Sequence, residues 1–242
     1  MSQTQETKIY DAVPSWSNFV TVKTTLPRRP FPPNSARQPF HTERLTLRPP
    51  TKDDLQFLRR LRTQPEVMQW TAAKRIDNDL AETESRLTPF LTPNDALTYN
   101  FAICLKETGE FVGIGGFHNG GFDQGEGKSL FGWPEVGYMF LKEFWGKGFG
   151  TEFLKGFKEL WSKLERETVE GLRVDERSVV RKADGSAEEV LAALTTDVNG
   201  RSQGVLRKCG FEEFARWRDE AEGGTGDVLP SYRWCPLREV RE

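Results

Sequence analysis

Residues 144–151 read FWGKGFGT, a stretch with glycine at every second position from 146 to 150. Glycine is unfavourable inside helices and strands because it loses more conformational freedom on folding than any other residue. The preceding EVGYMFLK of residues 135–142 nevertheless reads as a strand, and apolar side chains follow the glycines at the spacing of an amphipathic helix. These apolar residues are Phe153, Leu154, Phe157, Leu160, Trp161 and Leu164. The pattern therefore predicts a strand, a glycine-rich turn and a long helix in succession.

The three glycines admit two interpretations. Without a Cβ atom, consecutive backbone N–H groups can converge on a phosphate, and the helix that follows adds its dipole and its unpaired N–H groups. Lys147 would add a positive charge to such a site. Alternatively, the glycines form only a tight strand-to-helix turn that needs a flexible backbone. This stretch by itself does not decide between a pyrophosphate site and a turn.

Two other phosphate-binding motifs do not fit the sequence. The dinucleotide-binding motif G-x-G-x-x-G has one residue more between its second and third glycines than residues 146–150 provide. The GEGKS of residues 125–129 resembles the end of a P-loop, but Phe122 stands where that motif requires its first glycine. Glycine and proline follow at 132–134, where a P-loop requires a helix. We therefore expect neither a dinucleotide fold nor a P-loop.

The composition of the 242 residues argues against several classes of protein. The net charge of −2 lacks the basic excess that a nucleic-acid surface would need. Three widely spaced cysteines suit a reducing compartment better than a disulfide framework, and with the two histidines they form no metal-binding spacing. No apolar run approaches the roughly 20 residues of a membrane helix, and the N-terminus has no signal-peptide pattern. We expect a soluble, cytoplasmic protein with no metal site and with no membrane or nucleic-acid partner.

The chain reads as one domain with an extension and an insertion. Residues 1–40 are rich in serine, threonine and proline, which predicts a partly ordered N-terminal extension. The domain is expected over residues 41–242, with a charged insertion at about 165–189 that suits a hairpin closed at ADGS, residues 183–186. Strand and helix patterns follow one another in the order β-α-α-βββ-α-β-α-ββ. This order predicts an α/β (α+β) protein.

A second segment decides between the two interpretations of the glycines. Residues 199–202 read NGRS, and LRKCGF follows at 206–211. Together with PEVGYMFLKEFWGKGFGTEFL at 134–154, these motifs resemble the GNAT acetyltransferases, most of all their ribosomal-protein and N-terminal-amine acetylating branch. In that branch an E-x-G-Y strand leads into W-G-K-G-Y/F, and N-x-x-S with K-x-G-F follows on the next β-α unit. The resemblance covers about residues 41–237, and the charged insertion at 165–189 departs from the family's pattern.

The resemblance implies a fold and a co-substrate. The GNAT fold is a mixed, mostly antiparallel sheet with splayed central strands and flanking helices, and acetyl-CoA lies in the cleft between these strands like an extra strand. The splayed strands here would be residues 135–142 and 190–198. The residues implied to bind acetyl-CoA are Met139, Phe140, Leu141 and Asn199 for the pantetheine arm, and Gly146, Lys147, Gly148, Phe149, Gly150 and Thr151 for the pyrophosphate.

The resemblance also implies the reaction, which is acetyl transfer to a primary amine by direct attack in a ternary complex; the protein would be an N-acetyltransferase, a kind of acyltransferase. A protonated amine has no lone pair, so a base or a water chain must accept its proton. Glu135, at the start of the central strand, is the candidate base, although a glutamate at a strand end is ordinarily just solvated. Ser202 matches the position that this branch uses to protonate the departing thiolate, and Tyr138 is the alternative donor. A serine near a helix start is also an ordinary cap.

The acceptor is expected to be a protein N-terminus or a small-molecule amine, and the enzyme a monomer or a homodimer. Trp70 and Trp133 are candidates for the lining of the acceptor mouth. Acidic residues there would suit a cationic amine, although a solvated helix face explains most of them equally well. These acidic residues are Asp77, Asp79, Glu82, Glu84, Asp123 and Glu126. The alternative function is a non-catalytic acyl-CoA-binding or interaction protein on the same fold.

Overall fold

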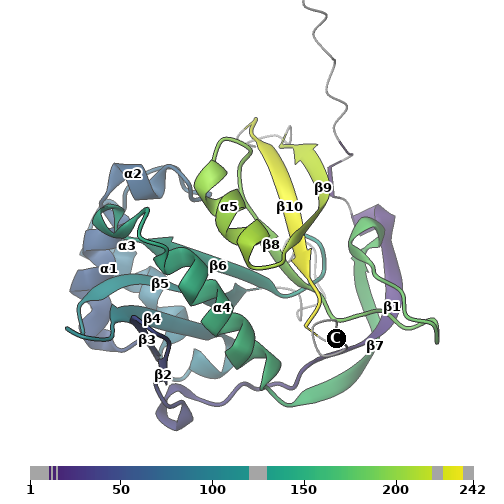
Figure 1. The fold of residues 1–242 in the computed structure, drawn as a ribbon, viewed down its shortest axis with the longest axis horizontal. Coiled ribbons are helices and arrows are strands. Elements are labelled where there is room, and N and C mark those ends of the chain that lie inside the picture. The colour runs from purple at the N-terminus through teal and green to yellow at the C-terminus, as the bar shows by residue number, and fades with distance from the viewer. Residues whose placement is uncertain (1–10, 12, 15, 120–129, 220–225, 237–242) are drawn as a thin grey trace, which may run out of the picture.

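An eight-stranded sheet organises the computed structural model, which describes residues 11, 13–14, 16–119, 130–219 and 226–236 (Figure 1). The strand order is β2-β3-β4-β5-β6-β8-β10-β9, and neighbouring strands are antiparallel except β6 and β8, which are parallel. The strands are β2 (Phe40–His41), β3 (Leu45–Arg48), β4 (Tyr99–Leu105), β5 (Phe111–Asn119), β6 (Glu135–Phe140), β8 (Leu191–Leu194), β9 (Glu212–Arg218) and β10 (Val228–Trp234). The sheet is thus mixed and mostly antiparallel.

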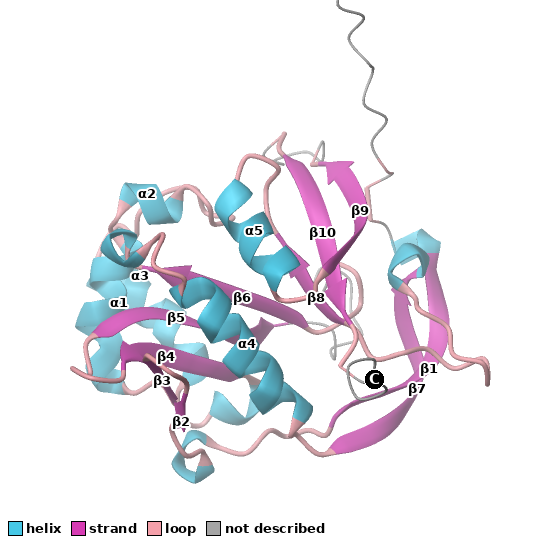
Figure 2. Ribbon diagram, viewed as in Figure 1, coloured by secondary structure: helices cyan, strands magenta, loops and turns pink. Residues whose placement is uncertain are grey.

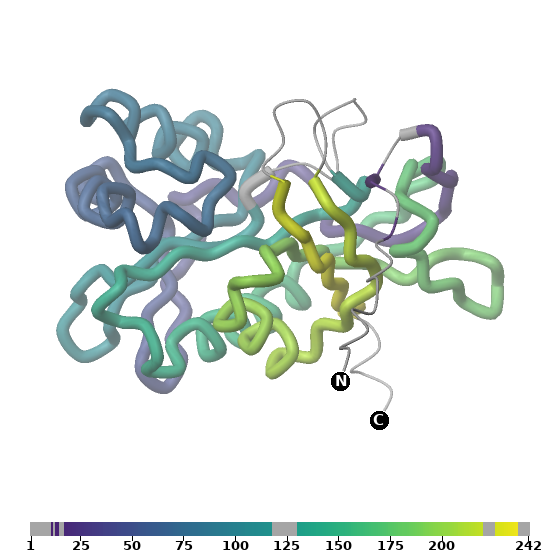
Figure 3. The backbone as a smooth tube through the Cα atoms, turned by 90° about the horizontal axis from the view of Figure 1, so that it is seen from above, coloured from purple at the N-terminus to yellow at the C-terminus, as the bar shows by residue number. Residues whose placement is uncertain are grey.

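Helices cover both faces of this sheet. Figures 2 and 3 show α4 and α5 on one face and α1, α2 and α3 on the other. The helices are α1 (Leu55–Arg62), α2 (Pro65–Met68), α3 (Leu80–Leu87), α4 (Phe149–Ser162) and α5 (Gly200–Lys208). From β3 onward, the order of helices and strands follows the predicted order, with the short α2 and one further strand, β7, as additions. The predicted α/β fold with flanking helices is confirmed.

The main core forms where α4 packs on the sheet. The side chains that helical spacing placed on one face of α4 include four that are fully buried, namely Phe153, Leu154, Phe157 and Trp161. Phe31, from the N-terminal segment, inserts its ring among those of Tyr99, Phe117 and Trp161, with ring centres 5.5, 5.6 and 6.1 Å away. A residue ahead of β2 therefore belongs to the same core as the long helix.

The two segments that the sequence sets apart as extension and insertion pair with each other. Strand β1 (Phe19–Pro27) and strand β7 (Arg166–Asp175) form a separate two-stranded antiparallel sheet. The expected turn at ADGS is present, since Lys182 N donates to Ser186 O at 2.8 Å. The long strand ahead of that turn pairs with β1 rather than across the turn. Backbone hydrogen bonds thus join parts of the chain that are far apart in sequence.

A buried carboxylate ties β7 to α4. Glu189 is fully buried; its Oε1 accepts a hydrogen bond from Trp161 Nε1 at 2.7 Å, and its Oε2 accepts one from Arg166 Nε at 2.8 Å. Burial raises the pKa of Glu189, and the charge and hydrogen bonds of Arg166, with the Trp161 hydrogen bond, oppose this increase. Because Trp161 lies in the last turn of α4 and Arg166 begins β7, one carboxylate fixes the connection between the two elements.

Arg166→Met should lower the free energy of unfolding by about 3–5 kcal/mol, because it leaves the Glu189 carboxylate buried without an opposing charge. The loss should grow as pH rises above the ordinary pKa of glutamate. With its pKa raised in the folded state, Glu189 keeps a proton that the unfolded chain releases, so rising pH favours the unfolded chain. Urea unfolding at about pH 5 and about pH 8 measures both effects.

Arg28→Met is the matched control for this substitution. Arg28 pairs with Glu165 at 3.0 Å beside the same connection, but the two side chains are 60% and 72% exposed. An exposed ion pair contributes little to stability. Equal losses for the two variants at both pH values would contradict the role given to Arg166.

Candidate active site

The central strands β6 and β8 pair at one end only. Within the described residues their register is a single parallel pair, Glu135 with Ala192, and Ala192 N donates to Pro134 O at 2.7 Å. Beyond this pair β6 continues along β5 and β8 along β10, so the two strands diverge (Figure 1). Helix α4 follows β6 and α5 follows β8, so both helices begin beyond the diverging ends. We call this region the splayed end.

The glycine-rich stretch forms the turn between β6 and α4. Gly146 and Gly148 have φ angles of +74° and +83°, a left-handed conformation that favours glycine. Gly148 is the N-cap of α4, and Glu152 N donates to its carbonyl oxygen at 3.1 Å. The N–H groups ahead of Glu152 in this first turn have no acceptor inside the helix; they are those of Phe149, Gly150 and Thr151. Such a group of donors, with the positive end of the helix dipole, can bind an anion.

The third glycine lies where α4 packs against α5. A Cβ atom on Gly150 would lie 3.3 Å from Val205 Cγ2 of α5, whereas one on Gly146 would meet nothing within 4 Å. Gly150 thus lets α4 approach α5 closely, while Gly146 and Gly148 are required by their φ angles. Both interpretations of the glycines therefore describe part of the geometry, because the glycines shape a tight turn and that turn precedes a row of N–H donors.

The start of α5 brings three predicted residues together. Asn199 is the N-cap of α5, and its Oδ1 accepts a hydrogen bond from Ser202 N at 3.1 Å. Ser202 Oγ lies 3.2 Å from the hydroxyl oxygen of Tyr138 on β6, within hydrogen-bond distance. The sequence offered Tyr138 only as an alternative to Ser202, whereas the structure pairs the two hydroxyls. This contact joins the strand on one side of the splayed end to the helix on the other.

The Tyr138 phenol keeps its proton at neutral pH. Burial raises the pKa of Tyr138 to about 12, and the hydrogen bond with Ser202 offsets only part of this increase. Each hydroxyl can donate one hydrogen bond and accept another. Ser202 can therefore donate its proton to a basic atom within hydrogen-bond distance, and Tyr138 can donate a proton to Ser202 in turn.

Glu135 lies apart from this hydroxyl pair. It is the first residue of β6, half-buried, at the position paired with Ala192. Because Tyr138 is three residues further along the strand, the two side chains point to opposite faces and are about 10 Å apart along the strand. The structure thus places the predicted base where β6 and β8 still pair, and the predicted proton donors where the strands have separated.

The backbone at the end of β6 is partly engaged within the protein. Leu141 N donates to Val112 O at 2.9 Å, and Leu141 O accepts from Phe144 N at 3.0 Å. Trp145 Nε1 donates to Phe140 O at 2.8 Å. Because backbone groups alternate in direction along a strand, the Phe140 N–H points away from β5 and toward β8. Leu141, which was expected to bind pantetheine through its backbone, therefore has both backbone groups bonded inside the chain.

Residues 44–212 match the protein family described as acetyltransferase (GNAT) domain. This segment begins just ahead of β3, ends at the start of β9, and contains the whole splayed end. The chain belongs to the GNAT acetyltransferase family.

Solved structures of GNAT proteins share the fold of this chain. Ribosomal-protein-S5-alanine acetyltransferase from Vibrio fischeri matches it with a TM-score of 0.59 and 14% identity, over 83% of this chain and 98% of that one. Spermidine N-acetyltransferase from Vibrio cholerae, solved with CoA and spermine, gives a TM-score of 0.59 and 13% identity, over 83% and 100% of the two chains. At these identities the likeness concerns the GNAT fold.

A sequence relative is described as uncharacterized N-acetyltransferase p20 from Bacillus licheniformis. It is 30% identical over 114 residues, which are 47% of this chain and 60% of the relative. The GNAT chain thus spans about 60% of the length of the curated relative that it matches. In the part of the chain that the structure describes, no helix has the length and apolar character needed to cross a bilayer.

Three acidic residues expected around the acceptor of this GNAT protein are used within the fold. The buried Asp77 carboxylate accepts hydrogen bonds from Arg62 Nε and Nη2 at 2.7 and 2.8 Å. Glu82 Oε1 accepts from Arg75 Nη2 at 2.7 Å, and Asp79 caps α3 by accepting from Glu82 N at 2.8 Å. Each of these carboxylates therefore has a partner within the fold, and arginines offset the charges of Asp77 and Glu82.

The two tryptophans proposed for the acceptor mouth differ. Trp133 is fully buried and its Nε1 donates to Ser178 Oγ at 2.8 Å, so its expected place at the mouth was wrong. It packs in the second core cluster, together with apolar side chains of β1 and β7. Trp70, just after α2, is 37% exposed. Asp123, Glu126 and the GEGKS of residues 125–129 lie outside the described residues.

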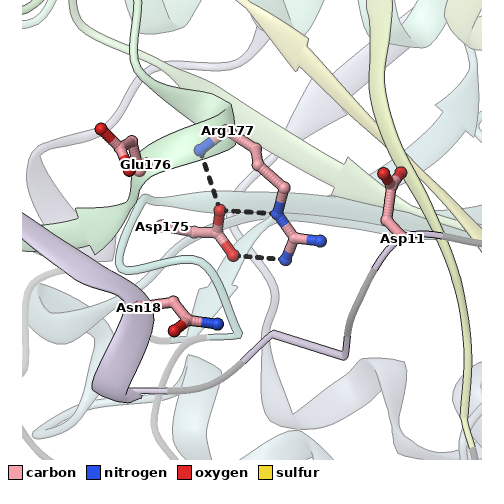
Figure 4. A pocket seen from close by; sticks show the side chains of 5 residues that line it. All are labelled: Asp11, Asn18, Asp175, Glu176 and Arg177. Atoms are coloured by element: carbon pink, nitrogen blue, oxygen red, sulfur yellow. Dashed lines mark hydrogen bonds and ion pairs between the residues drawn. The ribbon is translucent and has the colours of Figure 1, made fainter.

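A separate hollow lies beside the β1–β7 ribbon. It is lined by Asp11, Asn18, Asp175, Glu176 and Arg177 (Figure 4). Arg177 Nε and Nη2 donate to the two oxygens of Asp175 at 2.9 and 2.6 Å, and this bonding raises the pKa of Arg177. Among the residues that the structure covers, no group of three His, Cys, Asp or Glu is placed to hold a metal ion. The hollow is built from elements other than those of the splayed end.

Asn199→Ala should lower the free energy of unfolding by about 1 kcal/mol, because α5 loses the acceptor for Ser202 N. Asn199→Asp should keep the stability, since aspartate can accept the same hydrogen bond. Urea unfolding of the two variants measures the capping role without any ligand. If alanine and aspartate have the same effect, the cap does not stabilise α5.

Proposed function

We propose that this GNAT protein transfers the acetyl group of acetyl-CoA to a primary amine by direct attack in a ternary complex. The proposal is carried by the meeting of three features at the splayed end. These are the diverging strands β6 and β8, the N–H donors at the start of α4, and the Tyr138–Ser202 pair at the start of α5. The family match supports acetyl-CoA as the co-substrate.

Groups of the chain fit both ends of acetyl-CoA. The N–H groups of residues 146–151 would hold the pyrophosphate, and Lys147 would add a positive charge. The pantetheine arm would lie along β6 where β8 has left it, beside the Phe140 N–H, with Asn199 on the opposite side. The backbone groups of Met139, like those of Leu141, point toward β5, where Met139 pairs with Ile114. The proposal uses the Phe140 N–H in place of Leu141, whose backbone groups are bonded to Val112 and Phe144.

The side chains at the splayed end supply the proton transfers that the reaction needs. Bound acetyl-CoA supplies a thioester whose carbonyl carbon is attacked by the amine nitrogen while the carbon–sulfur bond breaks. Glu135 accepts the amine proton, directly or through water. Ser202 donates its hydroxyl proton to the departing sulfur, and the Tyr138 hydroxyl then gives its own proton to Ser202. Glu135 and Tyr138 are about 10 Å apart along the strand and on opposite faces of β6, so the amine and the acetyl group would meet between base and donor in the gap that β8 leaves beside β6.

The acceptor that we propose is a protein N-terminus or a small-molecule amine. Two GNAT proteins of the same fold carry the names of a ribosomal-protein alanine acetyltransferase and of a spermidine acetyltransferase, so both acceptor classes occur on this fold. The W-G-K-G-F and N-x-x-S motifs favour the N-terminal amine. The ion pairs of Asp77 and Glu82 with arginines favour it too, since paired carboxylates attract a polyamine weakly.

The experiment that tests the proposal measures binding and turnover separately. Calorimetry with CoA gives the dissociation constant, and release of free thiol from acetyl-CoA gives the rate with peptide N-termini, polyamines and small amines. CoA binding together with transfer to an amine is the expected result. CoA binding without transfer to any amine would favour a non-catalytic acyl-CoA-binding protein, and absence of both would contradict the proposal.

Ser202→Ala should lower kcat about 100-fold, because the departing sulfur loses its proton donor. The dissociation constant for acetyl-CoA should stay within about twofold of the wild-type value. Tyr138→Phe should lower kcat by about tenfold, and the double variant should be no slower than Ser202→Ala, because the two hydroxyls act in series. Steady-state kinetics test this order, with the exposed Ser85→Ala as control. If the kcat loss of the double variant equals the product of the two single losses, the two hydroxyls act as independent donors, which contradicts the proposed order.

Glu135→Gln should remove the acidic limb from the pH profile of kcat/KM, because glutamine cannot exchange a proton with the amine. Glu107→Gln, in the exposed turn between β4 and β5, is the control and should leave the profile as it is. An acidic limb that stays in place in Glu135→Gln would assign the proton to water or to another group.

A further inference from the structure

Arg44, between β2 and β3, contacts the glycine-rich turn and the first turn of α4 together. Its Nη1 donates to Lys147 O at 3.0 Å, and its guanidinium carbon lies 4.7 Å from the centre of the Phe149 ring. Its Nε and Nη2 both lie 2.7 Å from Glu152 Oε2. Glu152 Oε1 accepts hydrogen bonds from Arg44 N and Thr42 Oγ1, each at 2.6 Å. One arginine thus joins the β2–β3 turn to the proposed pyrophosphate site.

The bond to Lys147 fixes the direction of the next N–H group. The Lys147–Gly148 peptide is trans, and in a trans peptide the C=O and N–H point in opposite directions. Because Lys147 O points at Arg44, the Gly148 N–H points away from Arg44 and from the β2–β3 turn. Gly148 is the N-cap, so this donor is next in the chain to the N–H groups of the first turn of α4. Arg44 therefore holds the first donor of the row in one orientation.

Glu152 places a negative charge in the turn where the pyrophosphate is proposed to bind. Burial raises its pKa, but the hydrogen bonds from Thr42 and Arg44 and the charge of Arg44 outweigh burial and hold the pKa below its usual range. The carboxylate is therefore ionised at neutral pH. An acidic group at a helix N-terminus stabilises the helix, yet it repels a second anion at the same place. Arg44, in contact with Glu152 Oε2, cancels that repulsion.

We propose that Arg44 is a positioning residue for the diphosphate of a CoA thioester. It orients the Gly148 N–H and neutralises Glu152 without itself contacting the ligand. The inference rests on the proposed function, because it assumes that a CoA thioester binds at the splayed end. The inference adds Arg44, a residue of the β2–β3 turn, to a site whose sequence motifs lie within residues 135–151 and 199–202.

Calorimetry with CoA on the full chain tests the inference without relying on turnover. Arg44→Gln should raise the dissociation constant about tenfold, because it frees the Gly148 peptide and leaves Glu152 unneutralised. Arg44→Lys keeps the charge but not the bonds to both partners, so it should lose about threefold. Arg44→Gln combined with Glu152→Gln should recover most of the affinity lost in Arg44→Gln, since the repelling charge is gone.

A phosphate-free acetyl donor separates positioning from a general structural effect. With S-acetyl-N-acetylcysteamine, which has no phosphate, Arg44→Gln should keep the wild-type kcat/KM. Arg60→Gln is the matched control, because Arg60 pairs with Glu143 at 2.5 Å and is 52% exposed in its side chain, against 46% for Arg44. Its CoA affinity should equal that of the wild type.

Three results would overturn the inference. Arg44→Gln that binds CoA like the wild type shows that the bonds of Arg44 do not matter for the ligand. Arg44→Gln that loses the phosphate-free donor as strongly as acetyl-CoA shows a structural role only. Wild-type protein that binds no CoA overturns the proposed function and this inference with it, and that outcome is recognisable before any variant is made.

Discussion

The splayed end depends on the backbone pairing of β6 with β8 at one position, Glu135 with Ala192, where Ala192 N donates to Pro134 O. This pairing holds the two strands parallel where they begin; further along, β6 stays paired with β5 and β8 with β10, so the two strands diverge. A strand edge without a neighbour inside a sheet is unfavourable, because backbone polar groups need partners. A ligand that carries amide groups can complete such an edge as a further strand would. The two helices that begin beyond the diverging ends then supply charge complementarity at one end and hydroxyl groups at the other.

Arginine–carboxylate pairs connect separate elements in the described part of the chain, although the net charge of the protein is only −2. Each of four buried or half-buried carboxylates is contacted by the guanidinium of a different element or loop. The pairs are Arg44–Glu152, Arg48–Asp54, Arg62–Asp77 and Arg166–Glu189. Two-point contacts of this kind fix geometry as well as charge. The carboxylates therefore hold neighbouring elements together, and an acidic residue in the sequence is a poor guide to what a surface attracts.

Apart from α2 and β7, the helices and strands from β3 onward could be predicted because each has its signal within its own length: a period of two or 3.6 residues, a cap, or a glycine at its end. The pairing of β1 with β7 could not be predicted, because a local sequence pattern does not show which distant strand a strand pairs with. The contact of Tyr138 with Ser202 depends on how α5 docks on α4, and the contact of Arg44 with Lys147 depends on where the β2–β3 turn lies. Trp133 shows the same limit, since one aromatic residue in a sequence does not reveal whether its ring lies at a surface or in a core.

Phe31 shows how the order of synthesis bears on this fold. The ribosome releases the chain from its N-terminus, so Phe31 and β1 emerge long before Tyr99, Phe117, Trp161 and the strand β7. Until then an apolar ring and an open strand edge are exposed to other chains. The core cannot close around Phe31 before α4 has been made. Assembly of this protein therefore requires late segments to pair with an early one, and long-range contacts of this kind slow folding.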